Sequence, residues 1–177
     1  MKIDWKSALV KIIAICLLGL IILVSLPYKV TLICCLLVLL DKCFLARVRI
    51  VGIPEFTTLA TLLITLKYGL IGGFFLSTFM IFAPGLINVL IGEKWVVSPD
   101  FKPISFDFGN IKDFICVVII HYLRNFDLLV IMLVVTLFKT LVKIEGFKPT
   151  DTFSIPLTIG FNLILVYLLR DFILSLI

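Results

Sequence analysis

The sequence predicts an all-α fold: a polytopic integral membrane helical bundle with six or seven transmembrane segments, forming a single transmembrane domain over residues 1–177. Hydrophobic residues make up 62% of the chain and charged residues only 15%, and the mean hydropathy is +1.27. These values lie outside the usual range of water-soluble domains. A spanning helix needs about 20 apolar residues. A chain of 177 residues therefore has room for these segments and for no separate soluble domain.

Four apolar runs are long enough to cross a bilayer without further argument. They cover residues 8–26, 70–91, 128–144 and 155–177. The first run follows a basic start and resembles a signal peptide, but it is longer than a usual signal core, and residues 25–27 make a poor cleavage site. We therefore expect a retained first helix.

Three further runs are weaker, and each is either a short or tilted span or a re-entrant piece buried in protein. They are residues 30–46, 56–66 and 111–123. Asp41 and Lys42 interrupt the first of them and are expected to form an ion pair at the membrane interface. Glu55 precedes the second, where a carboxylate suits the N-terminal end of a helix.

The distribution of Lys and Arg predicts which loops face the cytoplasm. If all seven segments cross and the N-terminus is cytoplasmic, 12 of the 16 Lys and Arg residues lie on the inner side and 4 on the outer side. The outer four are Lys29, Lys67, Arg124 and Arg170. This bias favours a multi-pass protein of the cell membrane with seven crossings, and six is the competing count. Contact between the inner loops and anionic membrane lipids accounts for the net charge of +5, so nucleic acid is not an expected partner.

Polar and basic side chains converge on the short outer turns of this topology, which are predicted at residues 27–29, 67–69 and 124–127. His121 and Arg124 are three residues apart and share a helix face, where an imidazole and a guanidinium can receive an anionic ligand. Lys67 and Tyr68 occupy the preceding outer turn, and Arg170 lies at the outer end of the last segment. These five residues are the candidate ligand-binding residues.

The same residues also have ordinary roles at a membrane interface. Lys67 can extend to the lipid headgroups with Tyr68 beside it. Asp127 can cap the helix that follows it, and Arg170 can pair with Asp171. The sequence leaves both interpretations open.

Small and polar residues mark candidate helix-packing faces. Gly69, Gly73, Ser77 and Asn88 fall close to one face of the run at 70–91, beginning with a Gly-x-x-x-Gly that lets two backbones approach closely. These four are the expected helix-packing residues.

A stripe of hydroxyl groups follows one face of the run at 56–66. It contains Thr57, Thr61 and Thr65, whose side chains can bond neighbouring helices or their own backbone carbonyls, or can line a polar substrate cavity. Asn162 in the last run is a candidate for a hydrogen bond between helices, because a buried amide needs partners.

No sequence signature of an intramembrane enzyme occurs. The chain contains no H-E-x-x-H, no G-x-S-x-G, no paired acidic motif for diphosphate metals and no glycine-rich phosphate loop. The five cysteines fall in apolar segments without a C-x-x-C pair, which predicts buried thiols and not a metal site or a disulfide framework. We expect no enzyme activity, no catalytic residue, no metal and no cofactor. A cysteine or carboxylate close to His121 in space would reopen the question.

Residues 52–85 resemble part of two known membrane protein families. The chain reads Gly-Ile-Pro-Glu-Phe-Thr-Thr-Leu-Ala-Thr from Gly52, then Lys-Tyr-Gly-Leu-Ile-Gly-Gly from Lys67, then an apolar run that ends at Pro84 and Gly85. A proline-led helix with a Tyr-Gly-x-x-Gly type turn into a glycine-rich helix resembles the central hairpin of S components, the substrate-binding membrane subunits of energy-coupling-factor transporters. The rod-shape-determining membrane protein MreD is similar in size and in the same turn.

The two resemblances imply different functions. An S component implies a small-molecule ligand at the outer face and a partner transmembrane subunit driven by cytoplasmic ATPases. Our leading hypothesis is therefore a small integral membrane solute-binding or transport module of S-component type, with its ligand near the outer ends of the helices. The alternative is an MreD-like scaffold, a structural or assembly subunit of a membrane protein complex. Both hypotheses expect other membrane protein subunits as partners.

Overall fold

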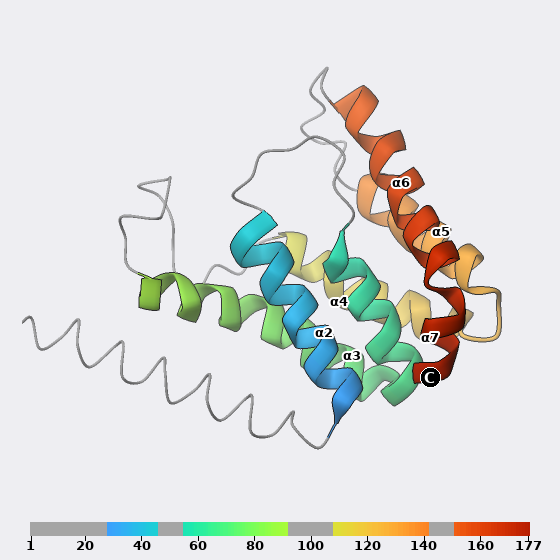
Figure 1. Cartoon of the computed structure of the whole chain (residues 1–177). Helices are drawn as coiled ribbons and strands as arrows, with labels where there is room; N and C mark the ends of the chain where they lie inside the picture. The colour runs from blue at the N-terminus through green and yellow to red at the C-terminus, as the bar shows by residue number, and fades with distance from the viewer. Residues whose placement is uncertain (1–27, 46–54, 92–107, 142–150) are drawn as a thin grey trace, which may run out of the picture.

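The computed structural model describes residues 28–45, 55–91, 108–141 and 151–177 (Figure 1). All secondary structure in these ranges is helical, which confirms the all-α class. The predicted first segment at 8–26 and most of the loop at 92–110 lie outside the described residues.

Helix α2 (Lys29–Leu39) continues into a π-helical turn, η1 (Leu40–Phe44), and together they occupy the predicted run at 30–46. Neither glycine nor proline interrupts these residues, so the apolar run can stay helical. Cys34, Cys35 and Val38 are buried, and α2 packs against α3.

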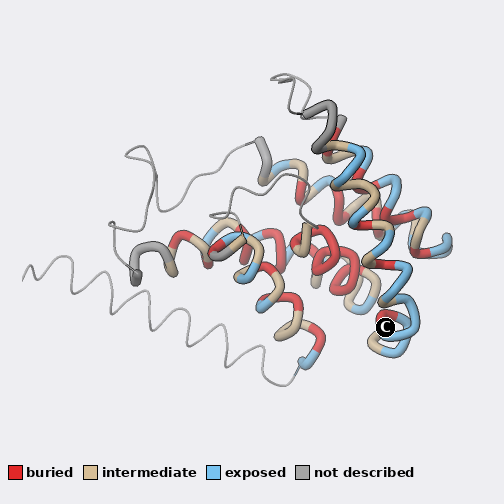
Figure 2. Tube along the Cα trace, turned by 45° about the horizontal axis from the view of Figure 1, so that its top comes forward, coloured by how far each residue is buried: buried red, intermediate tan, exposed pale blue. Residues whose placement is uncertain are grey.

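Helix α3 (Phe56–Ile91) contains both the third and the fourth predicted segments, and a break at Gly69 separates them into two arms. Gly69 has a φ of 68°, in the left-handed region that glycine enters at little cost. The first arm is the most continuously buried part of the described chain: every residue from Thr57 to Thr65 is buried (Figure 2).

Helices α4 (Phe108–Leu123) and α5 (Leu128–Leu141) form an antiparallel hairpin through the turn at 124–127. Asp127 begins α5 by accepting a hydrogen bond from the Leu129 backbone N–H at Oδ1, 2.9 Å away, which confirms its expected capping role. Helix α4 packs against α3 and against α5.

Helix α6 (Asp151–Leu168) returns along α5 and is followed at once by the short helix α7 (Arg170–Leu176). The two axes differ by 66° at Leu169, so the predicted last segment at 155–177 is broken near its end.

The first arm of α3 runs between two ends of the bundle. We call the end that holds the Gly69 break, the turn at 124–127 and α7 the turn end. Tyr28, at the start of α2, also lies there, because its ring is 5.9 Å from that of Tyr68. We call the other end, where α3 begins, the Glu55 end. The short connections predicted on the outer side thus meet at the turn end.

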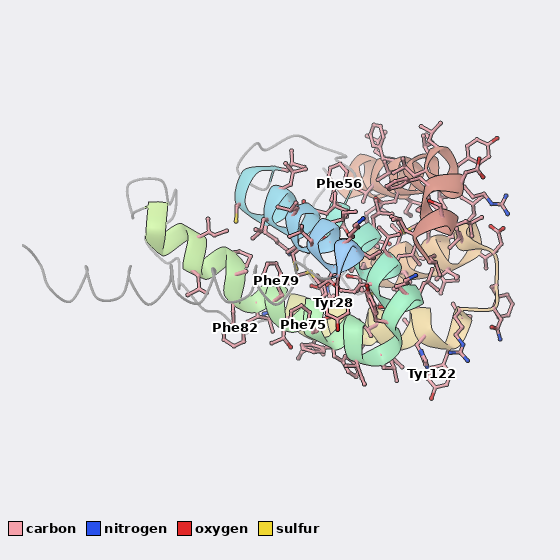
Figure 3. The ribbon with its side chains drawn as sticks, turned by 60° about the horizontal axis from the view of Figure 1, so that its bottom comes forward. Tyr28, Phe56, Phe75, Phe79, Phe82 and Tyr122 are labelled. Carbon is pink, nitrogen blue, oxygen red and sulfur yellow. The ribbon has the colours of Figure 1, made fainter. Side chains whose placement is uncertain are left out.

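Some polar side chains are buried in this bundle, and many large apolar side chains are exposed on its surface. Buried polar residues include Thr58, Thr136 and Asn162, each fully covered. By contrast, Ile71 is 85% exposed and Tyr122 is 78% exposed. Figure 3 shows Phe82 and Tyr122 projecting away from the ribbon. Buried polar side chains together with this much exposed apolar surface are unusual for a water-soluble protein, although the core itself is largely apolar.

Among the described residues, fewer helices are long enough to span a membrane than the number of apolar runs predicts. Within the described residues, Phe56–Ile87 is long and apolar enough to cross a membrane, and the bent pair Ile155–Leu168 and Arg170–Leu176 would be a second span if it counts as one. Leu128–Thr140 is apolar but shorter.

Candidate functional site

A cavity of about 330 Å³ opens at the turn end between α3, the turn at 124–127 and α7. Its polar lining consists of Arg124, Asn125, Asp127 and Arg170. Apolar side chains complete the wall: Leu66, Phe126, Leu128, Leu174 and Ile177. Its volume is at the lower end of the range for small-molecule sites.

Arg170 and Asp127 form an ion pair across this cavity. The Arg170 Nη2 atom donates to Asp127 Oδ2 at 2.8 Å, and the side chains are 48% and 41% exposed. The expected partner of Arg170 was its neighbour Asp171. The structure instead pairs it with a residue far away in sequence, because the bend at Leu169 turns α7 towards the α4–α5 turn.

Lys67 and Tyr68 stand at the rim of the turn end and not in the cavity lining. The Lys67 ammonium donates a hydrogen bond to the backbone oxygen of Ile177 at 2.8 Å, which ties the α3 break to α7. The Tyr68 ring packs edge-on against Tyr28.

Arg124 lines the cavity without an ion-pair partner among the described residues. His121 lies one turn earlier on α4 and is not part of the lining; its ring stands 6.0 Å from that of Tyr122. The structure therefore brings Arg124 and Arg170 together at the cavity and leaves Lys67, Tyr68 and His121 around it.

The four expected packing residues behave differently from one another. Gly73 and Ser77 are buried, and a Cβ added at Gly73 would lie 2.6 Å from Thr65 Oγ1 and would also meet the Val117 side chain. Gly69 makes no such contact, because an added Cβ there would meet nothing within 4 Å; its role is the chain break. Asn88 lies in α3, but its side chain is outside the described part.

A second polar site, which the sequence analysis missed, lies at the Glu55 end. Lys139 of α5 places Nζ 2.7 Å from Asp113 Oδ1 of α4 and 3.9 Å from Glu55 Oε2. The same Nζ donates to Thr58 Oγ1 at 3.0 Å, and Thr58 in turn donates to Glu55 Oε2 at 2.8 Å. One ammonium thus joins the starts of α3 and α4 to α5, and the two closest side chains are only 11% and 9% exposed.

Two more polar contacts hold the start of α3. Asp41 Oδ2 accepts the Thr57 backbone N–H at 2.9 Å, and Asn162 Oδ1 of α6 accepts the Glu55 backbone N–H at 2.9 Å. Asp41 therefore caps a helix from a distant segment, in place of the expected pair with Lys42. Asn162 makes the expected contact between helices. Its Nδ2 atom is buried without a hydrogen-bond partner among the described residues.

The described ranges contain no group of three or more His, Cys, Asp or Glu side chains that could hold a metal ion. Their four cysteines are buried and form no disulfide within these ranges: Cys34, Cys35, Cys43 and Cys116. Comparison with protein-family models, with curated proteins and with solved structures finds no match to this chain.

Proposed function

We propose that the chain is a small integral membrane protein that crosses the cell membrane several times, with a cytoplasmic N-terminus and the turn end outside. The exposed apolar surface supports this proposal, because it would be costly in water and is favourable against lipid tails. The interior polar contacts also fit, because a charge in a bilayer must be paired within the protein. In this orientation the Glu55 end faces the cytoplasm.

We further propose that its function is to bind a small solute for transport, as an S component does. The observation that carries this proposal is the cavity at the turn end, whose lining includes Arg124, a residue without an ion-pair partner in the described ranges. Arg124 is exposed at the mouth of a cavity with a mixed polar and apolar lining, so its guanidinium is accessible to a ligand.

Native mass spectrometry of the full chain, purified in a gentle detergent, tests this function. We expect a reproducible small-molecule adduct that is lost in Arg124→Ala. Lys42→Ala is the matched control, because Lys42 is an exposed cation in η1, away from the turn end. No adduct, or an adduct that survives Arg124→Ala, would contradict the proposal.

A second candidate function, an assembly subunit, is favoured by a different surface. An apolar groove of about 360 Å³ runs between α5 and α6, lined by Leu129, Val130, Leu133, Leu163, Ile164 and Tyr167. A groove of this kind could accept a transmembrane helix of a partner subunit. This function predicts a stoichiometric protein partner without a small molecule, released by Ile164→Trp. Gly73 and Ser77 are unsuitable positions for this test, because they are buried within the chain itself.

A further inference from the structure

Helix α7 forms one wall of the turn-end cavity and is tied down at both of its ends. Arg170, its first residue, pairs with Asp127, and Ile177, which follows it, accepts the hydrogen bond of Lys67. The 66° bend at Leu169 sets α7 off from α6 as a separate short helix. We propose that the cavity binds a small organic anion and that α7 closes on it, with Arg170 exchanging Asp127 for the anion. This inference rests on the solute-binding function proposed above.

The charge of the lining selects an anion. Two arginines, Arg124 and Arg170, stand against one carboxylate, Asp127, so the side chains of the lining carry one net positive charge. Guanidinium groups bind carboxylates and phosphates through paired N–H donors. An anion that reaches both arginines would satisfy Arg124 and compete directly with Asp127 for Arg170.

The Arg170–Asp127 pair is suited to exchange, whereas the other close ion pair is not. Both members of the former are nearly half exposed, so water and salt weaken their attraction. Lys139 and Asp113, at the Glu55 end, are close to fully covered, and breaking that pair would leave a buried charge. The closest atoms are 2.8 Å apart in the Arg170–Asp127 pair and 2.7 Å apart in the Lys139–Asp113 pair. The two pairs therefore differ in how exposed they are to solvent and not in distance.

The apolar residues of the lining favour an anion that carries an apolar group. Leu66, Leu128 and Leu174 come from three different elements and face the same cavity. A fully hydrated inorganic ion would gain nothing from them, whereas a ring or a short alkyl chain would bury apolar surface. The ligand class is therefore a carboxylate or a phosphate ester with an apolar part, either a free solute or the headgroup region of a lipid.

The experiment is a calorimetric titration of the full chain in neutral-lipid nanodiscs with three aromatic probes of similar size and different charge: benzoate, benzamide and benzylamine. We expect benzoate to bind best. Arg124→Gln should weaken benzoate binding by about tenfold or more, the loss of one charge-assisted contact, and Lys42→Gln should leave it unchanged. Asp127→Asn should strengthen benzoate binding by about threefold, because it removes the competitor for Arg170. The Asn side chain keeps the oxygen that caps α5.

The outcomes separate this inference from the function on which it rests. Benzamide binding as tightly as benzoate, or Asp127→Asn weakening benzoate, would overturn the anion exchange while leaving a solute site in place. Binding of none of the probes, in a protein that still carries its adduct in the mass spectrum, would overturn the ligand class alone. Nanodiscs containing phosphatidylglycerol identify the source: competition with benzoate indicates a lipid headgroup, and no competition indicates a free solute.

A spin label tests the closure of α7. Ser175 is exposed on α7 and is not part of the cavity lining, so a label at Ser175→Cys, in a background without the five native cysteines, reports the movement of this helix. Benzoate should reduce the mobility of this label when Arg170 is present, and should leave it unchanged in Arg170→Gln. Saturation with benzoate without any change in mobility would contradict the closure.

Discussion

Lys139 Nζ lies 2.7 Å from Asp113 Oδ1 in the interior of the bundle, and this contact joins α5 to α4. The same ammonium reaches Thr58 and Glu55 at the start of α3. Three helices therefore depend on one cation at the Glu55 end. The turn end is different, because its ion pair is nearly half exposed and lines a cavity.

Removing the interior cation should destabilise the protein strongly. In Lys139→Met the long side chain is retained but Asp113 is left as a covered, unpaired carboxylate, which costs about 3–5 kcal/mol. Thermal unfolding in detergent, followed by circular dichroism, measures the loss. Lys42→Met is the control, because Lys42 is exposed and the same change there should have little effect.

The double variant Lys139→Met with Asp113→Asn should recover part of this loss, because it removes both charges of the pair. If the Lys139→Met variant has the same melting temperature as the Lys42→Met control, the Lys139–Asp113 pair does not hold the helices together.

Gly73 should not tolerate a methyl group. An added Cβ meets Thr65 Oγ1 at 2.6 Å and the buried, β-branched Val117, which has little freedom to move. We expect Gly73→Ala to cost about 1–3 kcal/mol as an overpacked interior position. Gly160→Ala in α6 is the matched control, because nothing lies within 4 Å of its added Cβ. Equal melting temperatures for the two variants would contradict the close approach at Gly73.

Asp41 should act as a helix cap through its oxygen and not through its charge. Its Oδ2 accepts the Thr57 backbone N–H from a different segment of the chain. Asp41→Ala should cost about 1 kcal/mol, the usual value of a lost cap, whereas Asp41→Asn should retain most of the stability. Chemical denaturation of the purified protein compares the two, and equal losses would indicate that the charge matters instead.

Much of the helical layout follows from the sequence. Turns were predicted at Lys67 to Gly69 and at 124–127 because polar and glycine residues interrupt long apolar runs there, and the chain does turn at these places. The contact between Asn162 and another helix was also predicted, because a buried amide in an apolar run must find a partner.

The polar contacts at the Glu55 end could not be predicted from the sequence. Glu55, Asp113 and Lys139 stand far apart in the chain, and each alone has an ordinary interpretation as a charge near a helix end. Only the packing of α3, α4 and α5 brings them together. The bend at Leu169 was missed for a related reason: neither glycine nor proline marks it, so the apolar run looked continuous.

The central claim is that this bundle crosses the cell membrane with its turn end outside, and sided cysteine labelling tests it most directly. In a background without the five native cysteines, single cysteines are placed at three exposed positions: Asn125 and Ser175 at the turn end and Lys42 in η1. We predict that a membrane-impermeant maleimide labels Asn125→Cys and Ser175→Cys in intact cells and labels Lys42→Cys only after lysis. Equal labelling of all three in intact cells, or labelling of Asn125→Cys only after lysis, would contradict the claim.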